Sequence, residues 1–358
     1  MTTKLFEPIK IGSKIAINRI MMPSVLLYKA GTKDGAIGDF RMAHYEKLAQ
    51  RGVGMLVVEA TAVQEDYRLA ESQLGIWSDD FIDGFKKLES IIHKYPVVTV
   101  VQLQHCGGRR RYGNEKGTPI GPSTGEYDKC CMREATVAEL EGICKSYIDA
   151  ALRLKEAGFD GVELHSGHGH LLTQMLSPLV NKRNDEYGGT TEKRMKLSID
   201  IVQGIRKACG NNFLIGIRLG VNEPTYDDGI ANAKIYEKNG VDYINLCVGH
   251  GDLSILPETP DDFPYNVVVY GGRLIKESTD GVPIVLVNDV KTAERGEWLL
   301  QNGYGDMVAY GKGLLTTPDF VSRAKTDPSN NSDCTKCESC AWFTDYKKCP
   351  ALAKHKHL

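Results

Sequence analysis

Short apolar runs rich in β-branched residues alternate with amphipathic stretches along most of the chain. Eight such runs are short enough to be buried strands, and they begin at residues 19, 54, 97, 161, 213, 242, 283 and 306. Between most of them the apolar residues recur every three or four positions, which is typical of helices. One such stretch begins near Thr136 and ends at Gly158, and the segments EAG, KNG and QNG just before strands indicate glycine at helix C-termini.

Eight alternations of strand and helix predict a closed (β/α)8 barrel with insertions over residues 1–325. Residues 326–358 are expected to form a short cysteine-rich tail. An open doubly wound sheet is the alternative, but no GxGxxG segment follows the first strand. In a barrel the catalytic residues gather where the strands end, so these positions are the ones to examine.

Composition narrows the class of partner. The chain has 358 residues, of which 42% are apolar, and a formal net charge of −2. These values exclude a disordered or fibrous chain and give no sign of a nucleic-acid or anionic-membrane surface, so a small-molecule partner is expected. Charged residues throughout the N-terminal segment, and the lack of an 18-residue apolar run, predict a cytoplasmic protein without a cleaved leader or a membrane span.

Three histidines follow the fourth predicted strand within six residues: His165, His168 and His170. A catalytic zinc site would need another ligand and usually a carboxylate, and no HExxH pattern is present. Neutral imidazoles can instead donate hydrogen bonds to a substrate oxygen that gains negative charge. Histidines that merely pack or lie at the surface remain the alternative.

The segment after these histidines, SPLVNKRNDEYGG, resembles the Old Yellow Enzyme family of flavin ene-reductases. So do NRIMMP at 18, VEATAV at 58, VQLQHCGGR at 101 and GDMVAYGKGLLTTPDF at 305, which together cover about residues 5–325 in the same order. The likeness is greatest to the branch with 2,4-dienoyl-CoA reductase and the bile-acid and steroid enoate reductases, because that branch carries a cysteine cluster just after the barrel. The resemblance implies an FMN-binding barrel.

The resemblance also implies which residues hold FMN: Pro23, Ser24, Val25, Ala60, Gln102, Arg218, Asn288, Gly311 and Lys312. Gln102 is expected at the pyrimidine edge of the flavin, and Ala60 is small enough to let the ring approach. Arg218 is expected near N1 and C2=O, where a positive charge stabilises the reduced flavin. Each of these residues, taken singly, could instead have a purely structural role; Arg218, for example, could be a buried ion-pair partner.

His165 and His168 match the pair that, in this family, binds the carbonyl oxygen of the substrate while hydride passes from flavin N5 to the β-carbon. The family usually places a tyrosine two residues after the second of the pair, where this chain has His170. The proton for the α-carbon is therefore expected from His170, from Tyr28 or from water. An oxidative demethylase, or a flavoprotein that only transfers electrons, is the alternative function.

Three departures from the family pattern stand out. Leu26 replaces the threonine or cysteine that many relatives place beside flavin N5. Asn288 and Asp289 replace a Gly-Gly pair, although both residue types tolerate similar turns. Lys312 replaces an arginine at the phosphate, which exchanges a two-pronged donor for a point charge.

Four of the ten cysteines crowd into the tail, in a C-x2-C-x2-C-x8-C pattern: Cys334, Cys337, Cys340 and Cys349. This set could hold one [4Fe–4S] cluster, which is the favoured interpretation, or a zinc ion, and free thiols are a third possibility.

The electrons are expected either from NADH or NADPH directly or from a separate reductase through the cluster. A homo-oligomer is possible. The loops 104–135 and 249–272, with Tyr265 and Tyr270, are expected to shape the substrate pocket.

Overall fold

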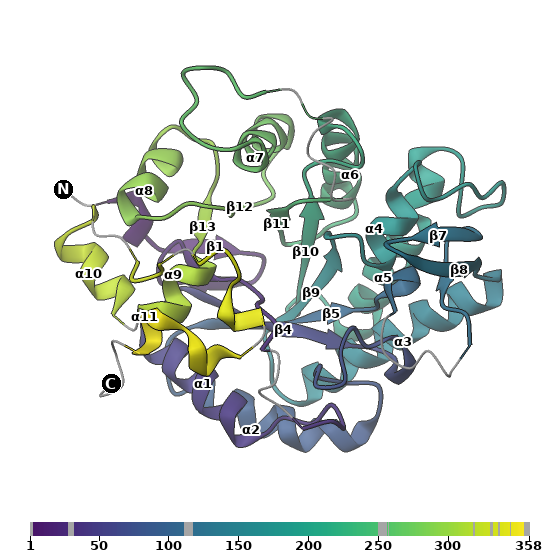
Figure 1. Cartoon of the computed structure of the whole chain (residues 1–358), viewed down its shortest axis with the longest axis horizontal. Helices are drawn as coiled ribbons and strands as arrows, with labels where there is room; N and C mark the ends of the chain where they lie inside the picture. Colours follow the sequence, from purple (N-terminus) through teal and green to yellow (C-terminus); the bar gives the residue numbers. More distant parts are fainter. Residues whose placement is uncertain are drawn as a thin grey trace.

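The computed structural model describes residues 3–27, 32–110, 117–249, 256, 258–317, 319–329, 332–335, 337–343 and 345–353. Its centre is a closed barrel of eight parallel strands in the order β10-β11-β12-β13-β3-β4-β5-β9, surrounded by helices (Figure 1). The predicted (β/α)8 barrel is therefore confirmed. The barrel strands are β3 (Ile20–Met22), β4 (Met55–Ala62), β5 (Val98–Gln104), β9 (Gly161–Ser166), β10 (Leu214–Gly220), β11 (Tyr243–Cys247), β12 (Ile284–Leu286) and β13 (Met307–Ala309).

Each of these strands overlaps one of the eight predicted apolar runs, and every residue of the eight strands is buried. Burial on both faces explains why the runs are continuous rather than alternating. The helices are α1 (Asp39–Gln50), α2 (Ile82–Ile92), α3 (Val137–Glu156), α4 (Leu171–Leu176), α5 (Thr191–Cys209), α6 (Tyr226–Lys238), α7 (Val267–Ser278), α8 (Ala293–Gln301), α9 (Gly311–Thr316), α10 (Phe320–Thr326) and α11 (Pro350–Ala353). Short 3-10 turns are η1 (Lys4–Phe6), η2 (Glu65–Tyr67), η3 (Asp79–Phe81), η4 (Gly107–Arg109), η6 (Ala341–Phe343) and η7 (Tyr346–Lys348).

The ends of α3 follow from local chemistry. Thr136 accepts a hydrogen bond from the backbone N–H of Glu139, whose side chain accepts from the backbone of Thr136 in return. Gly158 follows the helix with a φ of 98°, and the glycines of the KNG and QNG segments, Gly240 and Gly303, have φ values of 77° and 71°. All three lie in the left-handed region that favours glycine, so the predicted helix endings are confirmed.

Two further pieces of structure escaped the sequence prediction. A hairpin of β1 (Ile9–Ile11) and β2 (Lys14–Ala16) packs its apolar side chains against residues of the barrel strands such as Met55. A small sheet of β6 (Ile120–Gly121), β7 (Gly125–Tyr127) and β8 (Cys130–Glu134) is inserted between β5 and α3. These strands are too short, and the insertion too exposed, to give a clear periodic pattern.

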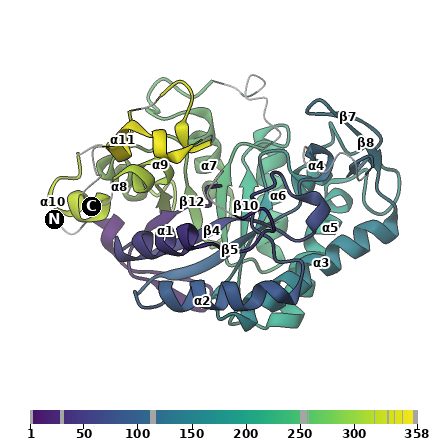
Figure 2. The same cartoon turned by 60° about the horizontal axis from the view of Figure 1, so that its bottom comes forward.

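The C-terminal tail packs beside α1 (Figures 1 and 2). The ring of Tyr346 lies 4.3 Å from that of Phe40, and Trp342 lies 5.9 Å from His44, measured between centroids. Trp342 is buried among these rings. None of the described helices is long and apolar enough to cross a membrane.

Candidate active site

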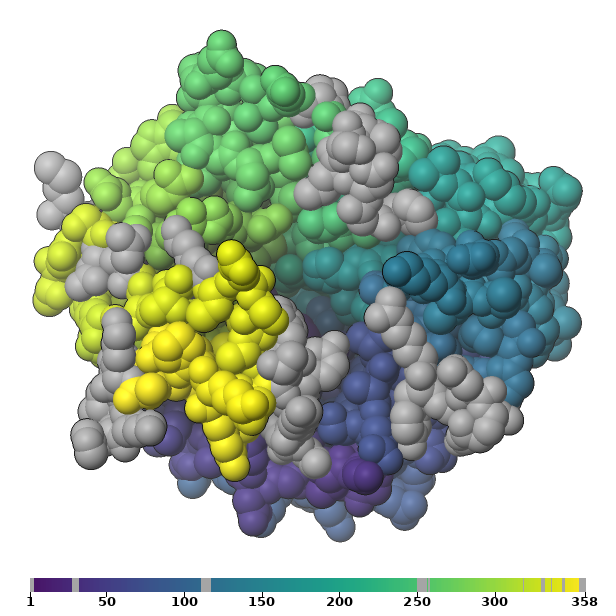
Figure 3. All heavy atoms as spheres, viewed as in Figure 1, coloured from purple at the N-terminus to yellow at the C-terminus, as the bar shows by residue number. Residues whose placement is uncertain are grey.

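Three adjoining cavities run from the histidine turn after β9 to the loops after β12 and β13. The histidine cavity, of about 370 Å³, is lined by Ser24, Val25, Leu26, Ala60, Leu69, Gln102, Gln104, Arg109, His165, His168, His170 and Arg218. The central cavity, of about 340 Å³, shares Ser24, Val25, His168 and Arg218 with the first and adds Pro23, Cys247, Val248, Val287, Asn288, Gly311, Lys312, Leu315, Cys340 and Trp342. The lysine cavity, of about 530 Å³, shares Val287, Asn288, Gly311 and Lys312 with the second. The surface is hollowed beside the yellow C-terminal segment in Figure 3.

The three predicted histidines come together at one end of this groove. His165 Nε2 lies 3.4 Å from His168 Nδ1, and the rings of His165 and His170 are 4.6 Å apart between centroids. Burial lowers the pKa of His168 to about 3 and lowers the pKa values of His165 and His170 well below the ordinary value. Arg109 lowers the pKa of all three further. The trio is therefore uncharged at neutral pH, so each ring carries one N–H donor.

His168 adopts an uncommon backbone conformation with a φ of 55°. The backbone N–H of His168 donates to the Val248 carbonyl at 3.0 Å, and the guanidinium of Arg109 donates to the backbone carbonyl oxygen of His168. A left-handed conformation costs a non-glycine residue about 1–2 kcal/mol. The surrounding hydrogen bonds offset this strain and hold the His168 ring at the wall of two cavities.

A buried carboxylate organises the inner side of the histidine cavity. Glu163 is fully buried in β9 and accepts hydrogen bonds from Gln102 at 2.7 Å, from Tyr243 at 3.0 Å and from Asn245 at 3.0 Å. Because Glu163 takes the amide N–H of Gln102, the amide oxygen of Gln102 is left to accept from Ser24, at 3.0 Å. The amide of Gln102 therefore has one defined orientation.

Arg218 is held by the same network. Its Nη1 donates to the Asn245 side-chain oxygen at 2.8 Å, while its buried Nε has no hydrogen-bond partner in the described structure. A buried donor without a partner is costly unless a ligand satisfies it. Arg218 lines both the histidine and the central cavity, so the groove offers a cationic donor to a bound group with acceptor atoms.

The far end of the groove is lined by polar residues, and the backbone makes a tight turn there. Asn288 and Asp289 have φ values of 89° and 62°, so the pair adopts the glycine-like turn that the sequence predicts it can tolerate. Lys312 is exposed beside it, in the first turn of α9, and lines the lysine cavity with Asn288 and Gly311. A cation with backbone N–H groups is a suitable surrounding for a phosphate.

The structure thus places every expected flavin residue along one groove, and the groove fits FMN: an unsatisfied cationic donor at Arg218, an oriented amide at Gln102 and a basic turn at Lys312. Ala60 and Leu26 form apolar parts of the histidine cavity, as expected from their positions. Tyr28 falls outside the described residues.

Several lining residues were missed from the sequence. Gln104 follows Gln102 by two positions in β5 and therefore faces the same side of the strand, so the alternation of side chains could have found it. Arg109 follows in η4 and lines the same cavity. Trp342 reaches the central cavity from the tail, where no local pattern predicts it, and Cys340, which the sequence assigns to a metal site, lines the same cavity.

The described structure does not bring the tail cysteines together into the metal centre that their spacing predicts. Cys334 borders the lysine cavity and Cys340 the central cavity, while Cys337 is exposed and Cys349 is buried. Across the described residues no three His, Cys, Asp or Glu side chains lie in a group that could hold a metal ion. The four thiols have the chemistry for a cluster or for zinc, but their arrangement does not fit either, so we derive no step through such a group.

Tyr265 and Tyr270 line none of the three cavities, although Tyr265 borders a smaller cavity that shares Asn288 and Lys291 with the lysine cavity. Tyr265 donates to the Arg295 carbonyl at 2.7 Å, and Tyr270 packs edge-on against Phe263, with ring centroids 5.2 Å apart. Both serve an aromatic cluster around α7 and α8. Their aromatic character is explained by this packing.

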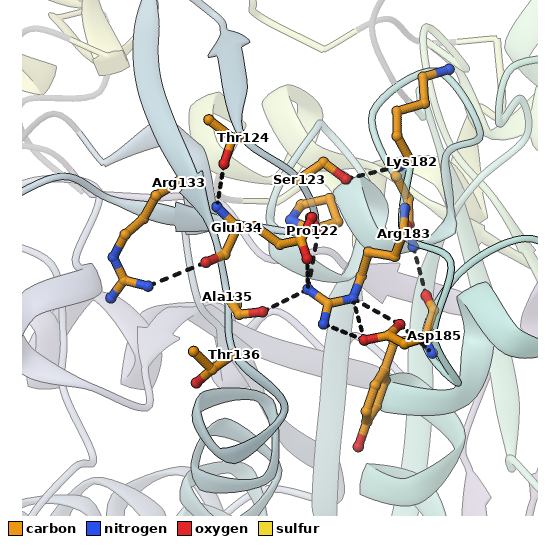
Figure 4. Close-up of polar contacts among 12 residues, drawn as sticks. Pro122, Ser123, Thr124, Arg133, Glu134, Ala135, Thr136, Lys182, Arg183 and Asp185 are labelled. Carbon is orange, nitrogen blue, oxygen red and sulfur yellow. Dashed lines mark hydrogen bonds and ion pairs between the residues drawn. The ribbon is translucent and has the colours of Figure 1, made fainter.

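The segment with the strongest family likeness supports the fold (Figure 4). The Arg183 guanidinium pairs with Asp185 through two nitrogens and donates to the carbonyls of Ala135, at 2.6 Å, and Pro122, at 3.2 Å. The backbone N–H of Lys182 donates to Ser123 Oγ at 2.8 Å. These contacts fasten the loop after α4 to the inserted sheet.

The sequence matches the NADH:flavin oxidoreductase / NADH oxidase family over residues 4–331. The chain belongs to this family. The resemblance to the Old Yellow Enzymes is therefore confirmed, whereas nothing places the chain in the 2,4-dienoyl-CoA reductase branch in particular. Membership makes it a flavin oxidoreductase of the group that uses NADH or NADPH.

Relatives in this family differ in length. The chain is 33% identical over 334 residues to the NADPH dehydrogenase of Bacillus subtilis, covering 90% of this chain and 95% of the relative. It is 32% identical over 351 residues to the NADH oxidase of Thermoanaerobacter brockii, covering 94% of this chain but 52% of the relative. The chain therefore spans about half the length of that NADH oxidase.

Solved structures show the same fold. A 2-naphthoyl-CoA reductase complex superposes with a TM-score of 0.86 at 23% identity, over 96% of this chain and 56% of the other. Morphinone reductase superposes with a TM-score of 0.78 at 23% identity, over 97% of this chain and 96% of the other.

Proposed function

We propose that the chain is an FMN-dependent ene-reductase that reduces the C=C bond of an α,β-unsaturated carbonyl compound with electrons from NADH or NADPH. The observation that carries this proposal is the pair of neutral histidines, His165 and His168, whose ring nitrogens converge at 3.4 Å on the wall of the cavity that Arg218 also lines. An electron carrier has no use for paired donors beside its flavin. The names of the relatives, NADPH dehydrogenase and NADH oxidase, support the electron source.

FMN would lie along the groove with its ring between Gln102 and Arg218 and its phosphate beside Lys312. When bound, FMN supplies a hydride to the β-carbon of the substrate and is reduced again by the nicotinamide. The chain orients the ring: Glu163 fixes the Gln102 amide, and Asn245 fixes the Arg218 guanidinium. Fixed partners of this kind lower the reorganisation that the reaction requires.

The two histidines stabilise the charge that develops on the substrate. As hydride arrives at the β-carbon, the carbonyl oxygen becomes an enolate oxygen, and His165 and His168 donate to it. Neutral imidazole donors that are already in place act strongly on such an oxygen, as neutral polarising histidines do in other enzymes. A proton then reaches the α-carbon, and the C=C bond has gained one hydride and one proton.

A metal site in the tail rests on the cysteine spacing alone, because the described arrangement of the thiols does not gather them. The test is to quantify iron and zinc together with FMN on anaerobically purified protein: about four irons per chain would support a [4Fe–4S] cluster. Zinc without iron would make the tail site structural.

The function is tested with a small cyclic enone, an enoate and an enoyl thioester, with NADH and NADPH, under anaerobic conditions. We expect His168→Ala and His165→Ala to lower kcat/KM for the alkene by about 10²–10³-fold, because each removes one donor to the developing oxyanion. The reduction of bound FMN by the nicotinamide, monitored by flavin bleaching without an alkene, should persist in both variants.

His93→Ala is the matched control, because His93 pairs with Asp160 and lies outside the three cavities. It should reduce alkenes like the parent protein. The proposal fails if the parent protein binds FMN and accepts electrons from the nicotinamide but reduces none of the three alkenes.

A further inference from the structure

A line of side-chain amides connects the backbone after η2 to His170. The N–H of Leu69 donates to the oxygen of the Gln73 amide, and the nitrogen of that amide donates to the Ala60 carbonyl at 2.9 Å and to the Gln104 amide oxygen at 2.7 Å. The nitrogen of Gln104 in turn lies 3.1 Å from His170 Nδ1. Gln73, Gln104 and His170 are all buried.

The two backbone groups at the start of this line settle the direction of every bond in it. Leu69 N–H can only donate and the Ala60 carbonyl can only accept, so the Gln73 amide cannot be turned over. Gln73 therefore offers a donor to Gln104, which must accept through its oxygen and present its nitrogen to His170. His170 Nδ1 must accept that bond, so the proton of the neutral ring sits on Nε2.

We propose that Gln73 and Gln104 are positioning residues that hold His170 as the Nε2–H tautomer, so that His170 gives the histidine cavity a third neutral N–H donor. The use of this donor on a substrate rests on the proposed ene-reductase function. The tautomer itself does not.

The electrostatics of the cavity agree with a donor that stays neutral. Burial and the nearby guanidinium of Arg109 lower the pKa of His170 well below the ordinary value. A neutral imidazole that released its Nε2 proton would become an anion, which is unfavourable in a buried site. His170 therefore donates a hydrogen bond to an oxygen atom of the substrate and does not deliver the proton to the α-carbon. Of the donors expected from the sequence, Tyr28 and water remain.

The tautomer can be read directly on the FMN-loaded protein. In protein labelled with ¹⁵N at histidine, two-bond ¹H–¹⁵N correlations distinguish the two neutral tautomers and the imidazolium form, and loss of a signal in His170→Asn assigns the ring. We expect the Nε2–H pattern for His170 at pH 7. An Nδ1–H pattern or an imidazolium would overturn the proposal.

Gln104→Glu reverses the polarity of the contact, because a carboxylate can only accept. We expect Nδ1 of His170 to gain a proton in this variant, either as the other tautomer or as the imidazolium. Gln64→Glu is the matched control, because Gln64 Oε1 makes a similar contact with His105 Nε2, at 3.2 Å, outside the three cavities. It should leave the His170 signals unchanged.

A second variant acts from one step further away. Gln73→Met removes the group that fixes the Gln104 amide, so Gln104 can turn over and both tautomers of His170 should be populated. If Gln104→Glu does not fold, the His170 tautomers of Gln73→Met provide the test of the proposal. An unchanged Nε2–H pattern in a folded Gln104→Glu or Gln73→Met protein would refute the proposal that these two glutamines hold the tautomer of His170. Because the readout needs no turnover, absence of alkene reduction would count against the proposed function and not against the tautomer.

Discussion

The amide nitrogen of Gln102, on β5, donates at 2.7 Å to the carboxylate of Glu163, which lies directly opposite on the neighbouring strand β9. Glu163 is fully buried and also accepts from Tyr243 and Asn245, so one carboxylate orients three side chains on two other strands. Asn245 in turn orients Arg218, by accepting a hydrogen bond from its guanidinium. The polar face offered to a flavin therefore depends on a residue that does not line the cavities.

Glu163→Gln should weaken FMN binding. A hydrogen bond to a charged group contributes about 1.5–3 kcal/mol, and the glutamine has one acceptor oxygen for the three donors, so we expect the Kd for FMN to rise by about 10- to 100-fold. Quenching of FMN fluorescence on binding to the apoprotein measures it. Glu156→Gln, at an exposed position near the end of α3, is the control and should leave the Kd unchanged.

Arg218→Met should lower the midpoint potential of the bound flavin. The guanidinium lies on the wall of the groove with a free Nε donor, and its positive charge favours the reduced, more negative flavin. A potentiometric titration with a reference dye measures the shift. Arg218→Lys keeps the charge and should recover most of the potential; equal potentials in the parent protein and the methionine variant would contradict the role.

Arg41→Met should destabilise the fold strongly. Arg41 and Glu59 form an ion pair at 2.7 Å with side-chain exposures of 1% and 0%, and Glu59 also accepts from the backbone of Leu27. Removing one partner of a buried pair typically costs about 3–5 kcal/mol, because the other charge is left uncompensated. Urea unfolding measures the loss.

The control for this change is an exposed ion pair. Lys145 and Asp149 pair one turn apart on α3, with the lysine side chain 76% exposed. Lys145→Met should leave the free energy of unfolding nearly unchanged, since exposed pairs contribute little. Equal losses in the two variants would show that burial does not govern the effect.

Stability should fall as the pH falls from 6.5 toward 3. Burial lowers the pKa of His44 and His105 to about 3, so in this window the unfolded chain, with histidine pKa values near 6.5, binds more protons than the folded chain. The free energy of unfolding therefore rises with pH across the window, and these groups contribute no slope above it. Urea titrations at a series of pH values measure this slope.

His44→Phe tests one of these groups, since phenylalanine keeps a ring beside Trp342 but binds no proton. The slope below pH 6.5 should become less steep by at most about 1.4 kcal/mol per pH unit. His93 behaves oppositely: Asp160 raises its pKa, so its stabilisation is present below pH 6.5 and is lost as the pH rises through the raised value. His93→Gln should therefore destabilise the protein at pH 6 and have little effect in alkaline solution.

Much of the fold and part of the site could be predicted from the sequence because their causes are local. Strands buried on both faces leave continuous apolar runs, and glycines such as Gly158 mark helix ends through their own conformational freedom. The family motifs identify the candidate flavin residues because those residues stand at fixed positions after such runs. His165 and His168 could be singled out for the same reason.

Other features lie between elements that are distant in the sequence, so no local pattern encodes them. The separation of Leu69 from His170 is about a hundred residues, yet a line of amides joins them and selects a tautomer. The tail shows the converse: its cysteine spacing predicts a metal centre, but spacing does not determine where the thiols point, and the described chain does not gather them.

The sequence by itself determined the barrel, the family and the positions that bear the chemistry, because hydrophobic periodicity and motif spacing are properties of the chain alone. Only the tertiary structure decided which polar groups satisfy one another: that Glu163 fixes Gln102, that Arg218 keeps a free donor, and that the tail packs through Trp342. The physical reason is that hydrogen bonds and burial depend on distances between groups, and closure of the barrel sets those distances.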